Sequence, residues 1–209
     1  ATKEGEACFL PLAETVLKDI PRSAVVKALR RIFSSDVNFI GHNIKYDCLL
    51  LRRIGIAIKR VHFDTMLAAF ACHGDWLYFK LQYLAQRLLG RRIKSYRDLL
   101  EEGDGGAELP FREIVNHACQ DADATLRLYP VLSAELAERN ITEQYHNQCM
   151  ALLRRLVDLE FRGISMNLRK VKRLRKSLLT EAVRLRSDAC KEAGRNFDVD
   201  SDRQVFEVL

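Results

Sequence analysis

Short apolar runs alternate with amphipathic stretches over the first third of the chain. Three runs have the length and composition of β-strands, and they cover residues 7–12, 37–41 and 58–64. Between them, apolar residues recur at helical spacing in residues 21–34 and 44–54. Strands that alternate with helices along a sequence predict an α/β sheet with helical crossovers.

The pattern after Trp76 is almost wholly helical. Residues 81–90 and then a long stretch from 111 to about 140 carry helical periodicity, and residues 101–110 (EEGDGGAELP) form the clearest loop. Two further long helices are expected at residues 143–162 and 168–193. This change from mixed to helical patterning predicts a domain boundary near residues 138–145.

Residues at the expected helix ends are consistent with these assignments. Pro21 suits the first turn of its helix, and Asp64 stands at the N-cap position ahead of TMLAAFACH. Gly90 is placed to end the helix that precedes it. Gly163 and Asn167 supply a break and an N-cap between the last two long helices.

Composition narrows the class of protein. The chain has 209 residues, of which 48% are hydrophobic, so it can form a large domain or one domain and part of another. Its apolar runs are too short to span a membrane, and its cysteines include no C-x-x-C pair. With no secretory signal recognisable, we expect a cytoplasmic protein without disulfides.

Positive charge gathers in one short segment. The net charge of +6 is compatible with a polyanionic partner without requiring one. A single helical stretch holds six of the basic residues: Arg169, Lys170, Lys172, Arg173, Arg175 and Lys176. The segment is either a solvated helix face or a surface that contacts phosphates.

Two polar pairs could carry chemistry. Asn43 precedes Asp47 by four positions after an expected strand, and His117 precedes Asp121 by four positions inside an expected helix. Side chains at this spacing share one face of a helix, and two such carboxylates could converge on a divalent cation. Alternatively, each aspartate is a helix cap or dipole partner, and Asp123 is a surface ion-pair partner for the residue four positions later.

The motifs together resemble the exonuclease domain of family A DNA polymerases. The resemblance runs through GHNIKYDCLLLRRIGI (41–56), FDTMLAAF (63–70), LQYLAQRLLG (81–90) and HACQDADATLRLYPVL (117–132). LLRRLVDLEFRGISMNLRKVKRL and NFDVDSDRQVFEVL are similar to the segment that opens the polymerase domain and leads into the thumb. The resemblance implies a ribonuclease-H-like 3'-5' exonuclease fold in residues 1–140 and an all-α thumb segment in residues 141–209.

The resemblance also implies roles for single residues. Asp47 and Asp121 would be two of four carboxylates that hold two divalent ions, Mg²⁺ or Mn²⁺, for hydrolysis of the 3'-terminal nucleotide of DNA. Asn43 and Tyr46 would line the site near that nucleotide. His117 stands where the family usually has a tyrosine that orients the attacking water. The implied partners are a single-stranded 3' end at this site and duplex DNA near the thumb, bound by a monomer.

Two departures from the family pattern matter. No Asp-x-Glu triplet occurs upstream of Asn43, so two of the four expected carboxylates and the strands that carry them are absent from this sequence. We therefore expect the sequence to be truncated at both ends, and the chain alone to be unstable and weakly active at most. The second departure is His117, whose imidazole is shorter than a tyrosine and titrates near neutrality.

Four functions remain open at this point. The first is the proofreading region of a working family A polymerase. The second is an exonuclease-like domain that has lost catalysis and serves as a DNA-binding scaffold. The third is an exoribonuclease of the ribonuclease D type, against which the thumb-like segment LVDLEFRGISMN argues. The fourth is a nucleic-acid-binding module without chemistry, recognisable by steep salt dependence and no metal dependence.

Overall fold

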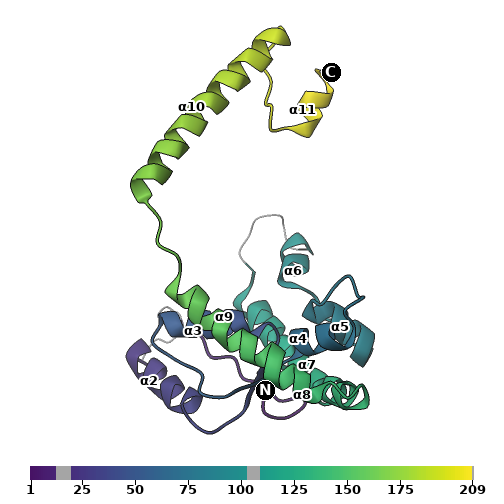
Figure 1. The fold of residues 1–209 in the computed structure, drawn as a ribbon. Coiled ribbons are helices and arrows are strands. Elements are labelled where there is room, and N and C mark those ends of the chain that lie inside the picture. Colours follow the sequence, from purple (N-terminus) through teal and green to yellow (C-terminus); the bar gives the residue numbers. More distant parts are fainter. Residues whose placement is uncertain (13–19, 103–108, 209) are drawn as a thin grey trace. The chain divides into compact units, whose positions relative to one another are not determined.

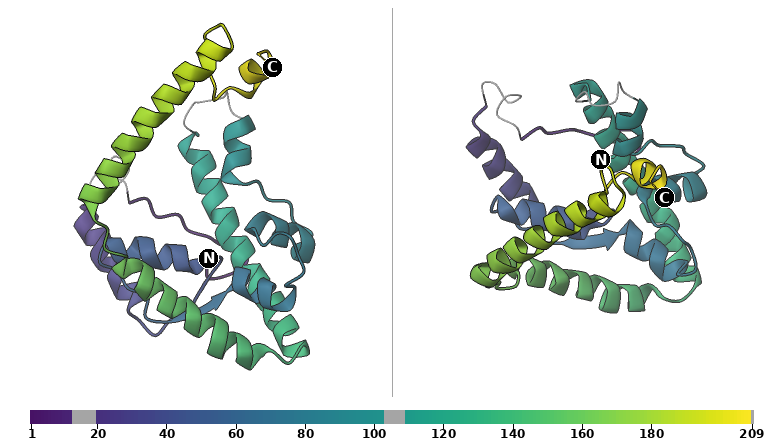
Figure 2. Two further views of the ribbon diagram at one scale, coloured as in Figure 1. Left: turned by 45° about the horizontal axis from the view of Figure 1, so that its top comes forward. Right: turned by 90° about the horizontal axis from the view of Figure 1, so that it is seen from above.

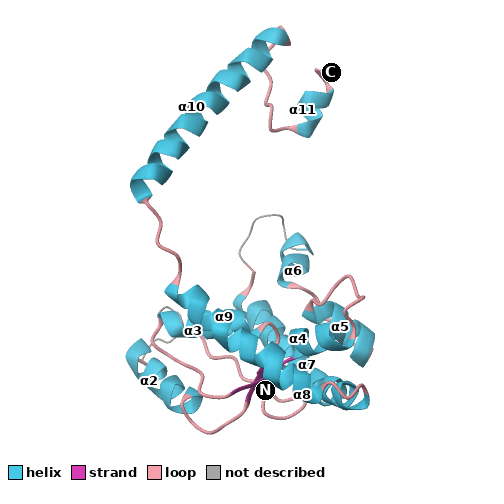
Figure 3. Cartoon of the chain, viewed as in Figure 1, coloured by secondary structure: helices cyan, strands magenta, loops and turns pink. Residues whose placement is uncertain are grey.

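The computed structural model describes residues 1–12, 20–102 and 109–208. The chain divides into two compact units, residues 1–162 and residues 163–209. Helices dominate the described residues, and two short strands form a small parallel sheet (Figure 3). The first unit is therefore a mostly helical α/β structure. Among the described helices, none is long and apolar enough to cross a membrane.

The sheet consists of β1 (Phe39–Gly41) and β2 (Val61–Asp64), which run parallel. Helix α2 (Arg22–Phe33) precedes β1, and α3 (Ile44–Arg53) connects the two strands. Figure 1 labels both of these helices. Both expected strands and both expected helices in this region are confirmed, although each strand is shorter than its apolar run. Because the strands are parallel, their carboxyl ends lie at the same edge of the sheet.

The expected strand at residues 7–12 is wrong. These residues lie in no strand. Within the described residues 1–12, the backbone makes one isolated bridge, between Lys3 and Glu6. An extended segment becomes a strand only where a neighbouring strand satisfies its N–H and C=O groups. The apolar pattern of ACFLPL gave the composition of a strand, but β1 pairs with β2 and not with this segment.

Three of the helices that follow β2 build most of the core. Helix α4 (Thr65–Cys72) and α5 (Leu81–Leu89) both pack against the long helix α7 (Phe111–Glu138), which also contacts β1. The most deeply buried side chains of this core include Phe63, Leu84, Leu128, Leu132 and Leu136. Gly90 ends α5 in the left-handed conformation, with φ 65°, as expected from its position.

The chain after α7 returns to the sheet. Helix α8 (Thr142–Gln144) leads into a π-helical turn, η1 (Tyr145–Cys149), and then into α9 (Met150–Arg162). Helix α9 contacts α3 and β2 through a stripe of apolar residues that includes buried Leu153 and Val157. The single helix expected at residues 143–162 is thus three successive helical segments. By its packing, α9 belongs to the first compact unit.

Helix α6 (Tyr96–Glu102) was not expected from the sequence pattern, and it includes the first two residues of the expected loop. Residues 103–108 of that loop lie outside the described residues.

The second unit holds α10 (Leu168–Glu192) and α11 (Asp202–Phe206). Asn167 caps α10, since its side-chain oxygen accepts a hydrogen bond from the Lys170 amide at 3.1 Å. Both views of Figure 2 show α10 as one uninterrupted helix. The helix expected at residues 168–193 is confirmed, and α11 was not expected.

Candidate active site

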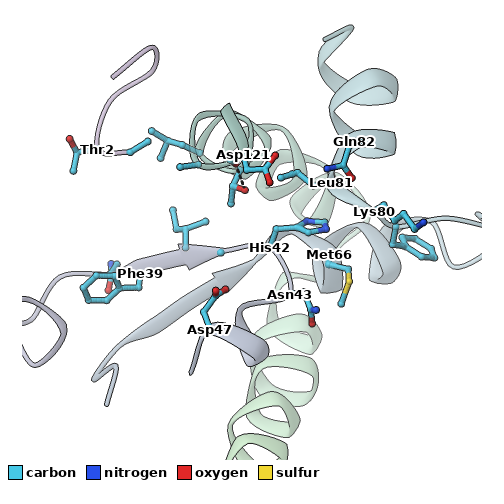
Figure 4. Close-up of a pocket in the computed structure, with 18 of the residues that line it drawn as sticks. Thr2, Phe39, His42, Asn43, Asp47, Met66, Lys80, Leu81, Gln82 and Asp121 are labelled. Carbon is cyan, nitrogen blue, oxygen red and sulfur yellow. Dashed lines mark hydrogen bonds between the residues drawn. The ribbon is translucent and has the colours of Figure 1, made fainter. Parts of the chain in front are cut away.

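The main cavity of the first unit lies beside β1 and extends to its carboxyl end. Its volume is about 1320 Å³, and Asn43, Asp47 and Asp121 are among the residues that line it. Figure 4 shows Asp121 on the helix above the strands, Asp47 on the helical turn below them, and His42 between the two in this view. The structure therefore brings to one cavity two carboxylates that come from α7 and α3.

Asp64 organises the edge of the sheet at which this cavity ends. Its carboxylate is 1% exposed and accepts four backbone hydrogen bonds. The Met66 and Leu67 amides donate to Oδ1 at 2.9 and 3.1 Å, as expected for the N-cap of α4. The Asn43 amide also donates to Oδ1, at 3.1 Å, and the Ile44 amide donates to Oδ2 at 2.8 Å. Asp64 therefore joins the starts of α3 and α4.

The backbone between β1 and α3 turns sharply, and this turn sets the position of Asp47. Asn43 adopts the left-handed conformation with φ 55°, and α3 begins at the next residue. A Cβ atom added to Gly41 would lie 2.6 Å from the Cβ of Ile44, so only glycine allows this close approach. Asp47 then lies in the first turn of α3, where the helix dipole favours a negative charge.

Tyr145 supports the same edge from within the core. Its hydroxyl accepts a hydrogen bond from the Asp64 amide at 2.8 Å and donates one to the Asp64 carbonyl at 3.0 Å. The side chain is fully buried, and burial raises the pKa of the phenol. Tyr145 opens the π-helical turn η1, so this turn places a polar atom against the backbone of the cap residue.

Asp47 keeps its proton more readily than an ordinary aspartate. Partial burial of the carboxyl group and repulsion from the Asp64 carboxylate raise its pKa to about 6. The residue as a whole is exposed to solvent, so water reaches the side chain on the cavity side. A carboxylate with this environment is stabilised by any cation that enters the cavity.

Asp121 has a carboxylate oxygen without a hydrogen-bond partner. Its Oδ1 is buried and has no hydrogen-bond partner, and burial raises the pKa of the group against the opposing effect of His117. His117 Nε2 lies 3.5 Å from the other oxygen, Oδ2. The neighbouring Asp123 behaves differently, because it pairs with Arg127 at 2.8 Å, as its spacing predicted.

His42 lines the cavity and escaped the sequence reasoning. Its Nδ1 lies 2.9 Å from the Thr65 hydroxyl, and burial lowers the pKa of the imidazole to about 4. His42 is therefore neutral near pH 7 and can accept or donate one hydrogen bond at the cavity without adding charge. The signal in the sequence was its place between a strand end and Asn43, where a polar residue meets the ligand edge of a sheet.

The remaining residues singled out in the sequence lie elsewhere. Tyr46 is 60% exposed and does not line the cavity, and His117 reaches the cavity through Asp121. Five basic residues proposed to contact DNA lie exposed along the first half of α10, in the second unit: Arg169, Lys170, Lys172, Arg173 and Lys176.

The donor set fits part of a divalent-metal site. Mg²⁺ and Mn²⁺ prefer carboxylate and water oxygens, and Asp121 Oδ1 is an oxygen that lacks any partner. Asp47 supplies a second carboxylate at the same cavity. Within residues 1–12, 20–102 and 109–208, no three acidic, histidine or cysteine side chains gather closely enough to hold a metal ion. Two carboxylates at one cavity are fewer oxygen ligands than a divalent ion of this kind takes up.

Comparison with known proteins supplies a family match. Residues 1–137 match the family model described as 3'-5' exonuclease. The chain is 30% identical over 194 residues to DNA polymerase I of Rhizobium leguminosarum and 28% identical over 221 residues to that of Pseudomonas aeruginosa. These alignments cover 91% and 100% of this chain but only 19% and 24% of the two relatives. The chain thus spans about a fifth to a quarter of their length.

A solved structure agrees in fold. It is the POL domain of Pol1 from M. smegmatis in complex with DNA primer-template and dNTP. The TM-score is 0.57 at 22% identity, and the match covers 88% of this chain and 29% of that chain. The likeness extends beyond residue 137, where the match to the family model ends.

Proposed function

This chain belongs to the 3'-5' exonuclease family of the family A DNA polymerases, and from that premise we propose that it removes the 3'-terminal nucleotide of a DNA strand. The observation that carries the proposal is the convergence of Asp47 and Asp121, from two separate elements, on one cavity. Neither carboxylate has a basic partner that neutralises it fully, and both have raised pKa values. Such a pair is suited to hold a cation.

The proposal gives roles to five polar residues in and around the cavity. Asp47 and Asp121 bind the metal ions, and His117, 3.5 Å from Asp121 Oδ2, takes the place of the tyrosine that orients the attacking water. Asn43 contacts the terminal nucleotide from the cavity lining, and Tyr46, outside that lining, contacts it from the exposed side of α3. Divalent ions, when bound, would activate a water molecule and offset the charge that develops on the scissile phosphate. Two further carboxylates are needed for the four of the family pattern, and this sequence has no Asp-x-Glu triplet upstream of Asn43 to supply them.

The finer architecture is part of the same proposal. We propose a ribonuclease-H-like exonuclease domain in residues 1–140 and the start of a polymerase thumb in residues 141–209. The parallel strands with flanking helices support the first, and the solved polymerase with a similar fold supports the second. The whole protein would then be a monomeric, cytoplasmic DNA polymerase that proofreads.

Duplex DNA is the proposed partner of α10. Its first half, residues 168–180, contains no acidic residue and exposes its basic side chains to solvent. Contacts of lysine and arginine with phosphates hold DNA without reading its sequence. Binding at this helix should therefore weaken steeply as salt concentration rises.

A second candidate is an exonuclease-like domain without catalysis. One observation favours it. Nowhere among the described residues do three or more histidine, cysteine, aspartate or glutamate side chains gather closely enough to hold a metal ion. In this case Asp47 would serve only as a dipole partner in the first turn of α3 and Asp121 only as a buried polar group, and the domain would bind DNA as a scaffold.

The test is an exonuclease assay on the full-length natural protein that carries this sequence. A 5'-labelled single-stranded oligonucleotide is incubated with Mg²⁺, and loss of 3'-terminal nucleotides is followed on a gel. Asp47→Asn and Asp121→Asn should each lower the rate at least a hundredfold, because each removes a proposed metal ligand. A tenfold change in rate corresponds to about 1.4 kcal/mol of transition-state stabilisation.

The matched control is Asp158→Asn, which removes an exposed carboxylate of α9 that pairs with Arg52 of α3. It should leave the rate within twofold of the parent. Metal-dependent trimming that both active-site variants retain would contradict the assignment of these carboxylates. DNA binding without any metal-dependent trimming would establish the scaffold instead.

A further inference from the structure

A second cavity lies at the opposite ends of the two strands from Asp47. It has a volume of about 330 Å³, and it is lined by residues at the start of β2, by His146 of the turn η1 and by Arg154 of α9. Asn38, just before β1, borders this cavity and the larger one. All of these residues belong to the first compact unit, so the cavity is built within one unit.

The lining of this cavity is strongly basic. Five of its seven residues carry a basic side chain, namely Lys59, Arg60, His62, His146 and Arg154, and none carries a carboxylate. One of these basic residues, Lys59, forms an ion pair with the Asp36 carboxylate at 2.9 Å. Asp36 is largely exposed, so it offsets only part of the positive charge.

The two guanidinium groups retain most of their hydrogen-bonding capacity. Arg60 Nη1 donates to the Asp36 carbonyl, and Arg154 Nη2 donates to the Val61 carbonyl, each at 3.3 Å. In the part of the chain that the structure describes, neither guanidinium pairs with a carboxylate. A guanidinium has five N–H donors, so each arginine can still present a two-pronged face to an anion.

Two histidines add donors to the same cavity. The rings of His62 and His146 lie 5.7 Å apart, and His62 Nε2 lies 3.3 Å from the Tyr129 hydroxyl. Burial lowers the pKa of His62, with smaller contributions from His146 and Arg60, so the imidazole is neutral near pH 7. An anion in the cavity would offset the repulsion that Arg60 contributes. The π-helical turn puts Tyr145 into the core and His146 against the cavity, so the turn serves both positions.

We propose that this cavity binds a phosphate group, as a monoester or as a diester of a nucleic-acid backbone. Phosphate matches the planar, bidentate geometry of two arginines better than a monovalent halide does, and the cavity has room for the group and its ester substituent. The site is separate from the carboxylates of the active site, which line the other cavity. It does not depend on the exonuclease reaction.

The test is isothermal titration calorimetry on the full-length natural protein in metal-free buffer. Three probes are titrated at constant ionic strength: inorganic phosphate, dAMP and the dinucleotide d(ApA) without a terminal phosphate. Sodium acetate is the reference anion. We expect saturable binding of at least one phosphate probe, weakened tenfold or more by Arg60→Gln and by Arg154→Gln.

Arg155→Gln is the matched control, because Arg155 is the exposed neighbour of Arg154 on α9 and does not line the cavity. It should change the affinity less than twofold, and circular dichroism melts should show all three variants folded. Binding of inorganic phosphate and dAMP alone would identify a monoester as the ligand, and binding of d(ApA) would identify a backbone diester. Responses no greater than with acetate, or equal losses in Arg154→Gln and Arg155→Gln, would overturn the proposal.

Discussion

Replacement of Asp64 by asparagine tests the central hydrogen-bonded junction of the structure. The side chains have the same shape, but asparagine offers one acceptor oxygen and one NH₂ group in place of two acceptors. With the oxygen in the Oδ1 position, the variant retains the bonds from Asn43, Met66 and Leu67. The NH₂ group then faces the Ile44 amide, which now donates to Oδ2 at 2.8 Å.

The expected cost follows from this one lost acceptor. A buried donor left without a partner costs about 1–3 kcal/mol, and the Ile44 amide is buried. Loss of the buried charge offsets part of this, since burial raises the pKa of Asp64 and its carboxylate repels Asp47. We therefore expect Asp64→Asn to lower the free energy of unfolding by about 1–2 kcal/mol at pH 7, in the lower part of that range, and to lower the pKa of Asp47.

Urea unfolding at pH 7 measures the first effect, and NMR titration of the Asp47 carboxyl measures the second. Asp36→Asn is the control: Asp36 is exposed and paired only with Lys59, so its loss should cost within about 0.5 kcal/mol. If Asp64→Asn were as mild as Asp36→Asn, the four-bond role of Asp64 would be refuted. An unchanged pKa at Asp47 would refute the electrostatic coupling between the two carboxylates.

Two other positions give separate tests. Because the pKa of Asp47 rises from 3.8 to about 6 on folding, the folded state binds its proton more tightly, and without metal the free energy of unfolding should fall as pH rises through that window. Asp47→Asn should abolish this fall in urea titrations at pH 4 and 7.5, and an identical pH slope in parent and variant would contradict it. Gly41→Ala should destabilise the fold by about 1–3 kcal/mol through the clash with Ile44. Gly74→Ala is the control, because its added Cβ has its nearest neighbour at 3.6 Å, and it should change the free energy of unfolding by no more than about 0.5 kcal/mol in the same urea titrations. Equal losses in the two variants would show that crowding at Gly41 is not the cause.

The candidate site was predictable from the sequence only in part. Motif resemblance singled out Asn43, Asp47 and Asp121, and the structure places all three at one cavity. Spacing also predicted the Asp123–Arg127 pair, because residues four apart on a helix are always neighbours. Neither argument reached His42, whose role depends on Thr65 of the following helix and on burial by the cavity wall.

What the sequence by itself determined is local. Apolar periodicity set the helices α2, α3, α5, α7 and α10. Cap residues set the start of α4 at Asp64, the end of α5 at Gly90 and the start of α10 at Asn167, since caps act within a few residues. The failure at residues 7–12 has the same cause, because a strand needs a partner that no local pattern reports.

Only the tertiary structure decided which distant groups meet. Asp64 could be recognised as a cap of α4, but its bonds to the start of α3 depend on two parallel strands ending at the same edge. The cluster of His62, His146 and Arg154 joins a strand, a π-helical turn and a helix that no motif connects. Burial, pKa and charge density are set by every neighbour in space, whereas periodicity along the chain reports only the nearest few residues.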